Sequence, residues 1–428
     1  MSILIKNATI VTQNEKREIK RADIFIEDDK ISEISDKIKV SADHIIDGSG
    51  CAVLPGFINT HTHSAMTLFR GSVDDIQLEK FLEKTSKLDA KMTKESVEIG
   101  ATLAAVEMIK SGTTSFVDLY YFEDAVAKAV QKAGIRGFLA WVTLDEKFTT
   151  QKGKPISNCE NFIKTHKGKD LITPMVGLQG VYVCSEETLM KAKELADKNN
   201  TMMTMHLSET RGEVYEHQKK TDKYPPKFLD DIGFLADNFL AVHCVWMTVN
   251  DLNLLAKHNV KVAHCPISNM KLASGGVAPL PEMFERNMPV SLGTDSTASN
   301  NSLDLFSEMK VCGLLHKTHR WDASVLPAQK ILDMATIDAA KALKMEKTLG
   351  SIEAGKKADM ILINLKQPNM TPTRDNNIVS NIIYSCNSGN VDTVIINGKI
   401  VMEKRKMITV DEGEIVKKAE LCAKGFFE

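Results

Sequence analysis

The alternation of hydrophobic and polar positions changes character twice along the chain. Up to about residue 55 it has a period of two, as in Ile3–Thr12 and Ala22–Glu27, which is typical of half-buried β-strands. The polar residues 28–30 separate the second of these runs from another that begins at Ile31, as in a β-hairpin. We therefore expect this segment to be half of a small β domain.

From about residue 93 to residue 345, short apolar runs alternate with amphipathic helical segments. One helix is predicted at Ser96–Lys110, and Ser185 and Thr248 have the side chains of helix N-caps. The predicted strands are the run before His61 and Ser115–Leu119, Gly137–Thr143, Leu171–Gly177, Met202–His206, Phe239–His243, Lys261–Cys265 and Pro289–Gly293. Eight such units predict an α/β fold with a (β/α)8 barrel. The alternative is an open doubly wound sheet, but the sequence has no GxGxxG motif on the turn after the first strand.

Strand-like alternation returns after residue 350, in Ala358–Asn364 and Val391–Asn397, before a last helix opened by Asp411. We expect the two chain ends to form one discontinuous β-sandwich domain beside the barrel. The predicted division is residues 1–55 and 350–428 for the sandwich and residues 56–349 for the barrel.

Composition narrows the classes of protein. The 428 residues carry a formal net charge of -2 and no long basic block, so neither nucleic acid nor an anionic membrane surface is an expected partner. No apolar run approaches the roughly 20 residues that cross a bilayer, and no signal peptide opens the chain. The 8 cysteines are scattered singly, as in a reducing compartment. We predict a cytoplasmic protein.

The first chemical signal is the pair His61 and His63 at the end of an apolar strand. In an extended strand these two side chains point to the same side, about 7 Å apart along the backbone. Two imidazoles that converge in this way make half of a transition-metal site, although a bare HxH is also common on surfaces. The other half has to come from residues further along the chain.

Other strands of the predicted barrel end in residues of the same kind, and in a (β/α)8 barrel chemistry occurs at these ends. His206 ends one strand and is followed by Glu209, His243 ends the next, and Asp295 follows the last. Each alone has an ordinary structural explanation, but the coincidence of all of them is improbable. Three imidazoles and one carboxylate fit a catalytic zinc-type centre with a position left for water. Glu209 then suits a general acid/base, and His243 can polarise the substrate.

The motifs resemble those of the amidohydrolase superfamily, in the branch of 5′-methylthioadenosine/S-adenosylhomocysteine deaminases and related ring deaminases. They are the residues 55–63, 66–71, 206–209, 243–245, 268–272 and 292–301. The resemblance implies one divalent ion held by His61, His63, His206 and Asp295. It also implies Glu209 as proton shuttle, Asp295 as a second base and His243 beside the reacting atom.

Zinc is the expected metal, with iron, manganese or cobalt as alternatives. Two-metal relatives carry a bridging lysine at the end of the fourth barrel strand, and residues 176–182 contain none. One catalytic ion is therefore expected, and with it deamination of a ring carbon in a small-molecule substrate. We also expect a homo-oligomer.

Three substrate-binding positions depart from the pattern of that branch. Asp89 stands where a ribose-binding glutamate is usual, Trp141 where an arginine is usual, and Gln179 where a histidine is usual. An adenosine-derived nucleoside is the expected substrate, with guanine, a pterin or an s-triazine, including its dechlorination, as alternatives. The remaining alternative is that the protein is a catalytically inactive homologue that serves as a scaffold. The Lys- and Thr-rich residues 145–169 are predicted to be a loop that could cover the site.

Overall fold

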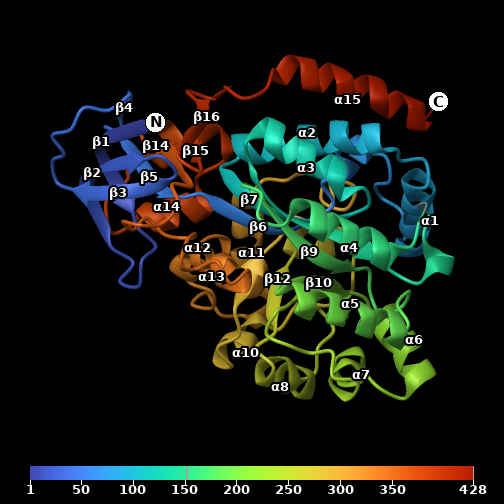
Figure 1. The fold of residues 1–428 in the computed structure, drawn as a ribbon. Helices are drawn as coiled ribbons and strands as arrows, with labels where there is room; N and C mark the ends of the chain where they lie inside the picture. The colour runs from blue at the N-terminus through green and yellow to red at the C-terminus, as the bar shows by residue number, and fades with distance from the viewer. Residues whose placement is uncertain (151–152, 428) are drawn as a thin grey trace.

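The two chain ends form a single sheet in the computed structural model, which describes residues 1–150 and 153–427. Its nine strands run in the order β17-β16-β15-β14-β5-β1-β2-β3, with β4 paired to β1. Their bounds are β1 Ser2–Val11, β2 Ile19–Glu27, β3 Lys30–Ser35, β4 His44–Asp47, β5 Cys51–Pro55, β14 Met360–Asn364, β15 Val391–Ile396, β16 Lys399–Glu403 and β17 Lys406–Met407. The pairing of β5 with β14 joins the two ends of the chain (Figure 1).

This sheet has its own hydrophobic core, to which strands from both chain ends contribute. Ile5 on β1, Ile24 on β2, Val53 on β5 and Leu362 on β14 are at most 1% exposed and belong to one cluster. The sheet domain built from both ends is thus confirmed. The exact domain bounds stay a prediction.

The predicted barrel is confirmed. Its eight strands follow one another in chain order, and all neighbouring pairs are parallel. Their bounds are β6 Phe57–Thr62, β7 Thr113–Tyr120, β8 Arg136–Thr143, β9 Ile172–Leu178, β10 Met203–Leu207, β11 Phe239–His243, β12 Lys261–His264 and β13 Val290–Leu292. A bridge between Thr62 and Asp295 and a hydrogen bond from the Thr294 amide to Asn59 (3.0 Å) join β13 to β6 and nearly close the barrel.

Helices cover the outside of the barrel (Figure 1). The α-helices are α1 Leu78–Asp89, α2 Lys94–Lys110, α3 Glu123–Ala133, α4 Pro155–His166, α5 Glu186–Asn199, α6 Arg211–Thr221, α7 Pro225–Asp231, α8 Val249–Lys257, α9 Pro266–Lys271, α10 Leu280–Glu285, α11 Leu305–Arg320, α12 Ala328–Ala335, α13 Ile337–Ala342, α14 Ile378–Tyr384 and α15 Glu412–Phe427. Short 3-10 turns are η1 Ser64–Phe69, η2 Glu146–Phe148, η3 Pro368–Met370 and η4 Ser388–Asn390. Within the described ranges, no helix is both long enough and apolar enough to cross a membrane.

Helix α2 fixes the segment that follows the HxH motif. A side chain at Gly100 would come within 2.4 Å of the Ala65 carbonyl oxygen, so only glycine allows this close approach to η1. The Thr67 hydroxyl donates to the Gly100 carbonyl at 2.7 Å. The backbone just after His63 is therefore held against a long, buried helix.

The prediction of one continuous loop at residues 145–169 is wrong in its second half. Residues Pro155–His166 form α4, which begins with proline at its first position and buries Cys159, Phe162 and Ile163. The Lys, Thr and Asn residues that suggested a loop lie on the outer face of this helix. The composition of the segment therefore did not reveal its apolar face. Residues 151–152 of the predicted loop lie outside the described residues.

Candidate metal and catalytic site

The two histidines of the HxH motif enter the site from the end of β6. A carbonyl oxygen can only accept, so His63 Nδ1, 2.6 Å from the Leu119 carbonyl oxygen, carries the proton. The Nε2 atom of His63 faces Asp295, whose Oδ1 lies 3.3 Å away. His61 is fully buried, and its Nε2 lies 3.6 Å from the same oxygen.

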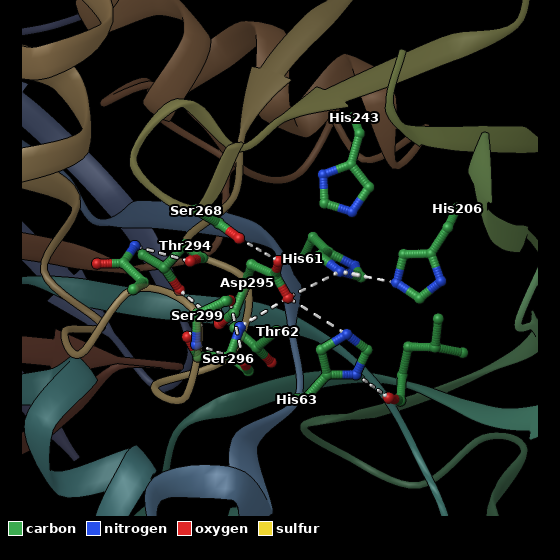
Figure 2. Close-up of polar contacts among 12 residues, drawn as sticks. His61, Thr62, His63, His206, His243, Ser268, Thr294, Asp295, Ser296 and Ser299 are labelled. Carbon is green, nitrogen blue, oxygen red and sulfur yellow. Dashed lines mark hydrogen bonds and ion pairs between the residues drawn. The ribbon is translucent and has the colours of Figure 1, made fainter. Parts of the chain in front are cut away.

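His206 at β10 brings the third imidazole. Its Nδ1 lies 2.7 Å from the Gln179 carbonyl oxygen and therefore donates to it, which leaves Nε2 unprotonated. That Nε2 is 3.3 Å from His61 Nε2. Figure 2 places the rings of His61, His63 and His206 around the Asp295 carboxylate.

Asp295 follows β13 and has a left-handed backbone, with φ of 62°. Its Oδ2 accepts a hydrogen bond from the Ser268 hydroxyl at 2.6 Å, and its Oδ1 accepts one from the Ser296 amide at 2.7 Å. The carboxylate is thereby fixed in one orientation (Figure 2).

Burial and the neighbouring charges tune these groups. Burial lowers the pKa of His61 to about 4 and that of His206 well below its usual range. Burial also opposes the charged form of His63, but its hydrogen bond to Asp295 raises its pKa to about 9. Burial would raise the pKa of Asp295, yet hydrogen bonds from His61 and His63 hold it well below the ordinary value. His61 and His206 are thus neutral and Asp295 is ionised, and once His63 gives up its Nε2 proton the set becomes the donor set that suits a zinc-type ion.

Glu209 and His243 lie beside this cluster. Glu209 Oε2 is 3.7 Å from His243 Nε2, and burial raises the pKa of the Glu209 carboxyl group. The His243 ring stacks against His206 with centroids 5.4 Å apart, and its Nδ1 lies 3.1 Å from the Asn269 amide nitrogen. All six residues expected in the metal and catalytic centre therefore lie in one place.

A cavity of about 650 Å³ opens above these groups. Its floor contains His63, His206, Glu209, His243 and Asp295. Its walls are largely apolar, with Leu78, Phe81, Val142, Leu144, Phe148, Tyr182 and Leu272 among the lining residues. Polar and charged residues, among them Asp89, Glu216 and Lys220, interrupt this apolar lining.

Of the three expected substrate-binding residues, two line the cavity. The Asp89 carboxylate is there and accepts a hydrogen bond from the Tyr120 hydroxyl. Burial raises the pKa of Asp89 to about 6. Gln179 is there as well, and its side-chain amide donates to the Tyr182 hydroxyl at 3.1 Å.

Trp141 is not among the residues that line the cavity, which corrects the expectation for it. Its ring lies between Phe122 and Phe162, with centroids 6.5 and 6.0 Å away, in the layer between β8 and α4. Side chains alternate along a strand, and Val142 is the neighbour that faces the cavity.

Several supporting residues were not predicted. The buried Asp118 carboxylate accepts hydrogen bonds from the Thr62 hydroxyl and from the Ser64 amide and hydroxyl, each at 2.7 Å. The Glu213 carboxylate accepts from the amides of Ser208 and Glu209 at 3.0 and 2.9 Å. Asp118 lies near the end of a correctly predicted strand, which is a signal that could have identified it. Glu213 is on a helix and carried no such signal.

Comparison with known proteins agrees with this geometry. The profile of the amidohydrolase family matches residues 52–401. The chain belongs to the amidohydrolase family. This amidohydrolase is 44% identical over 426 residues to a 5'-deoxyadenosine deaminase of Methanosarcina mazei, which covers 98% of this chain and 97% of that protein. It is 41% identical over 410 residues to a 5-methylthioadenosine/S-adenosylhomocysteine deaminase of Thermococcus onnurineus, with 95% of each chain covered.

Solved structures resemble the amidohydrolase over nearly its whole length. An adenosine deaminase of Xanthomonas campestris with bound zinc superposes with a TM-score of 0.95 at 28% identity and covers 99% of this chain and 98% of its own. An atrazine chlorohydrolase of Arthrobacter aurescens, also with zinc, has a TM-score of 0.92 at 22% identity and covers 98% and 100%. The second likeness concerns the fold alone.

Proposed function

We propose that this amidohydrolase is a metal-dependent deaminase of adenosine-type nucleosides. In this reaction water replaces the exocyclic ring amine, and ammonia leaves. The observation that carries the proposal is the convergence of five groups at one cavity, His63, His206, Asp295, Glu209 and His243, with the buried His61 next to them. The names of the relatives with 44% and 41% identity support the same reaction.

We propose His61, His63, His206 and Asp295 as the ligands of a single catalytic ion. The unprotonated Nε2 atoms and the ionised carboxylate fit such an ion, which when bound lowers the pKa of the attacking water. The absence of lysine from β9 argues against a bridged pair of ions. We infer zinc, because the donor set suits it and because the adenosine deaminase structure contains it. Iron, manganese and cobalt stay alternatives.

The protons are moved by this chain's own carboxylates. Glu209 accepts one proton from water as the oxygen bonds to the ring carbon, and delivers it to the adjacent ring nitrogen. Asp295 accepts the second proton, which leaves with the amine as ammonia. His243, next to Glu209, is placed to donate a hydrogen bond to the attacking oxygen. Because burial raises the pKa of Glu209, this residue is better matched to both proton steps than an exposed glutamate.

The cavity walls offer contacts to the 5′ end of a nucleoside. Leu78, Phe81 and Leu144 line the cavity and can contact a methyl or methylthio group. Glu216 and Lys220 also line it, so charged partners for a larger 5′ substituent are present as well. Asp89 and Gln179 remain the candidate partners of the ribose and base. Small-molecule hydrolysis needs no further partner, and both the homo-oligomeric state and the cytoplasmic location stay predictions.

A substrate screen tests the proposal. The purified, zinc-loaded protein is incubated with 5'-deoxyadenosine, methylthioadenosine, S-adenosylhomocysteine, adenine, guanine, a pterin and a chlorinated s-triazine, and both ammonia and chloride are measured. We expect ammonia from the nucleosides. Chloride release alone, or ammonia from guanine or pterin but not from any adenosine, would contradict the proposed substrate class. No turnover of any compound by metal-loaded protein would favour the inactive scaffold.

A further inference from the structure

A second cluster of metal-binding side chains lies outside the catalytic cavity. His264 is the last residue of β12, and Cys312 and His316 are one turn apart on α11. All three are at most 1% exposed. One ligand atom from each lies within 4.8 Å of the other two. None of the three lines the catalytic cavity.

The spacing of the two imidazoles matches that at the catalytic centre. His264 Nε2 and His316 Nε2 are 3.3 Å apart, the same separation as between His61 Nε2 and His206 Nε2. Two nitrogen ligands at about 2.0–2.1 Å from a tetrahedral zinc ion are roughly 3.3–3.4 Å apart. A direct hydrogen bond between two rings would be expected nearer ~2.9–3.0 Å. The separation therefore fits two nitrogen ligands of a shared ion, and it is also within reach of a hydrogen bond between the two rings.

We propose that His264, Cys312 and His316 form a second, structural binding site for a zinc-type ion. The thiol and two imidazoles are the soft and borderline ligands that zinc selects in structural sites. On binding, the Cys312 S–H bond breaks, the sulfur electron pair forms the bond to the ion, and the proton passes to water. No oxidant or reductant is needed.

The surroundings suit the charge of such an ion. Burial lowers the pKa of His316 to about 4 and that of His264 well below its usual range, so both rings are neutral and have a free electron pair. A divalent ion and one thiolate leave a single positive charge in a dry place, which is costly without compensation. Glu308 lies one turn before Cys312 on the same side of α11 and is 1% exposed. Burial raises the pKa of its carboxyl group well above the ordinary range, so Glu308 balances that charge only when the ion draws off its proton.

The site would tie the end of β12 to α11. Helix α9 starts directly after β12 and carries Ser268 and Asn269, which contact Asp295 and His243. An ion at this place would therefore stabilise the segment that supports the catalytic centre. It takes no part in the chemistry.

Cobalt substitution separates the two sites, because only the second contains sulfur. The full-length protein is produced with Co²⁺ in place of zinc, and the ultraviolet thiolate-to-cobalt charge-transfer band is recorded with the metal content. We expect the band in the wild-type protein, with two ions per chain. It should persist in His206→Ala, which loses the catalytic ion, and in Cys159→Ser, which removes a buried thiol elsewhere in the barrel wall.

The band should disappear in Cys312→Ser together with one ion per chain, while turnover of the remaining enzyme stays within about twofold. His316→Asn should lose the band and one ion per chain in the same way. It provides a second test if Cys312→Ser does not fold. A wild-type protein with one ion per chain and no thiolate band would overturn the proposal, whatever the variants do. That result would leave the proposed deaminase activity untouched, because it is measured by ammonia release.

Discussion

The floor and the walls of the catalytic cavity are built in different ways. On the floor, Asp295, His63 and His206 come from barrel strand ends, and each makes hydrogen bonds at 2.6–2.7 Å that fix its orientation. The walls come from helix α1 and from the connections after β8 and β9. There Leu82, Phe148 and Tyr182 are 54%, 44% and 46% exposed. We therefore expect substitutions on the floor to affect the reaction itself and substitutions in the walls, where side chains are less constrained, to affect the choice of substrate.

The largest expected effect follows from removal of a ligand on the floor. His206→Ala should lower the metal content by one ion per chain and turnover by more than ~10⁴-fold, because the ion and the water it activates are both lost. Metal analysis and ammonia release measure the two effects. His166→Ala, which removes a buried imidazole packed on Phe162 outside the cavity, should keep the metal and most of the activity. Full activity in His206→Ala would remove this residue from the centre.

A smaller effect is expected on the wall, at Asp89. If its carboxylate accepts hydrogen bonds from the ribose diol, Asp89→Asn should lower kcat/KM for nucleosides and leave kcat/KM for free adenine unchanged. A hydrogen bond to a charged group contributes ~1.5–3 kcal/mol, which corresponds to roughly 10- to 150-fold in kcat/KM. Adenosine and adenine are compared in both proteins. Tyr120→Phe is the control, because it removes the neighbouring hydroxyl and keeps the carboxylate. Equal losses on both substrates would take Asp89 out of ribose binding.

The pH dependence should report the same carboxylate. Burial raises the pKa of Asp89 to about 6, so the residue is protonated below that pH and ionised above it. Nucleoside kcat/KM should therefore rise with pH and level off above about 6, and this step should be missing in Asp89→Asn. The same shift makes the folded state lose stability as pH rises from the ordinary carboxyl range through 6, because the buried group must then become charged. A denaturation series with pH should show a smaller loss in Asp89→Asn than in the wild-type protein, because Asp304 and Glu213, whose pKa values burial raises to about 6 and about 7, are present in both.

The smallest effect on activity is expected at Trp141, and its neighbour on β8 gives the contrast. Trp141→Phe should lower the free energy of unfolding by about 1–3 kcal/mol through lost packing on Phe122 and Phe162, with kcat/KM changed less than about twofold. Val142→Ala should instead change KM, because Val142 lines the cavity. The reverse pattern, with KM altered by the tryptophan variant, would contradict the orientation of β8.

The sequence predicted the barrel well because strand and helix periods differ strongly. Phe239–His243 has the same bounds in the prediction and in the structure. The clustering of the candidate metal and catalytic residues was predictable for a related reason, because histidines and aspartates at the ends of barrel strands can be recognised once the strands are predicted. The prediction that Trp141 lines the cavity was wrong, because neighbouring residues of a strand point to opposite faces and Val142 is the one that faces the cavity. Glu213 and Asn269 could not be predicted, because each acts through a contact that only the folded chain creates.

The most direct test of the account is Glu209→Gln, measured with 5'-deoxyadenosine as substrate and with the bound metal quantified in the same sample. Glu209 is the expected proton carrier for both steps, and a general acid/base contributes typically ~10²–10⁴-fold. We predict unchanged metal content and a loss of kcat at or beyond the upper end of that range. A variant that binds metal normally and keeps more than about a tenth of the wild-type rate would contradict the account, because the protons would then have to move through another residue.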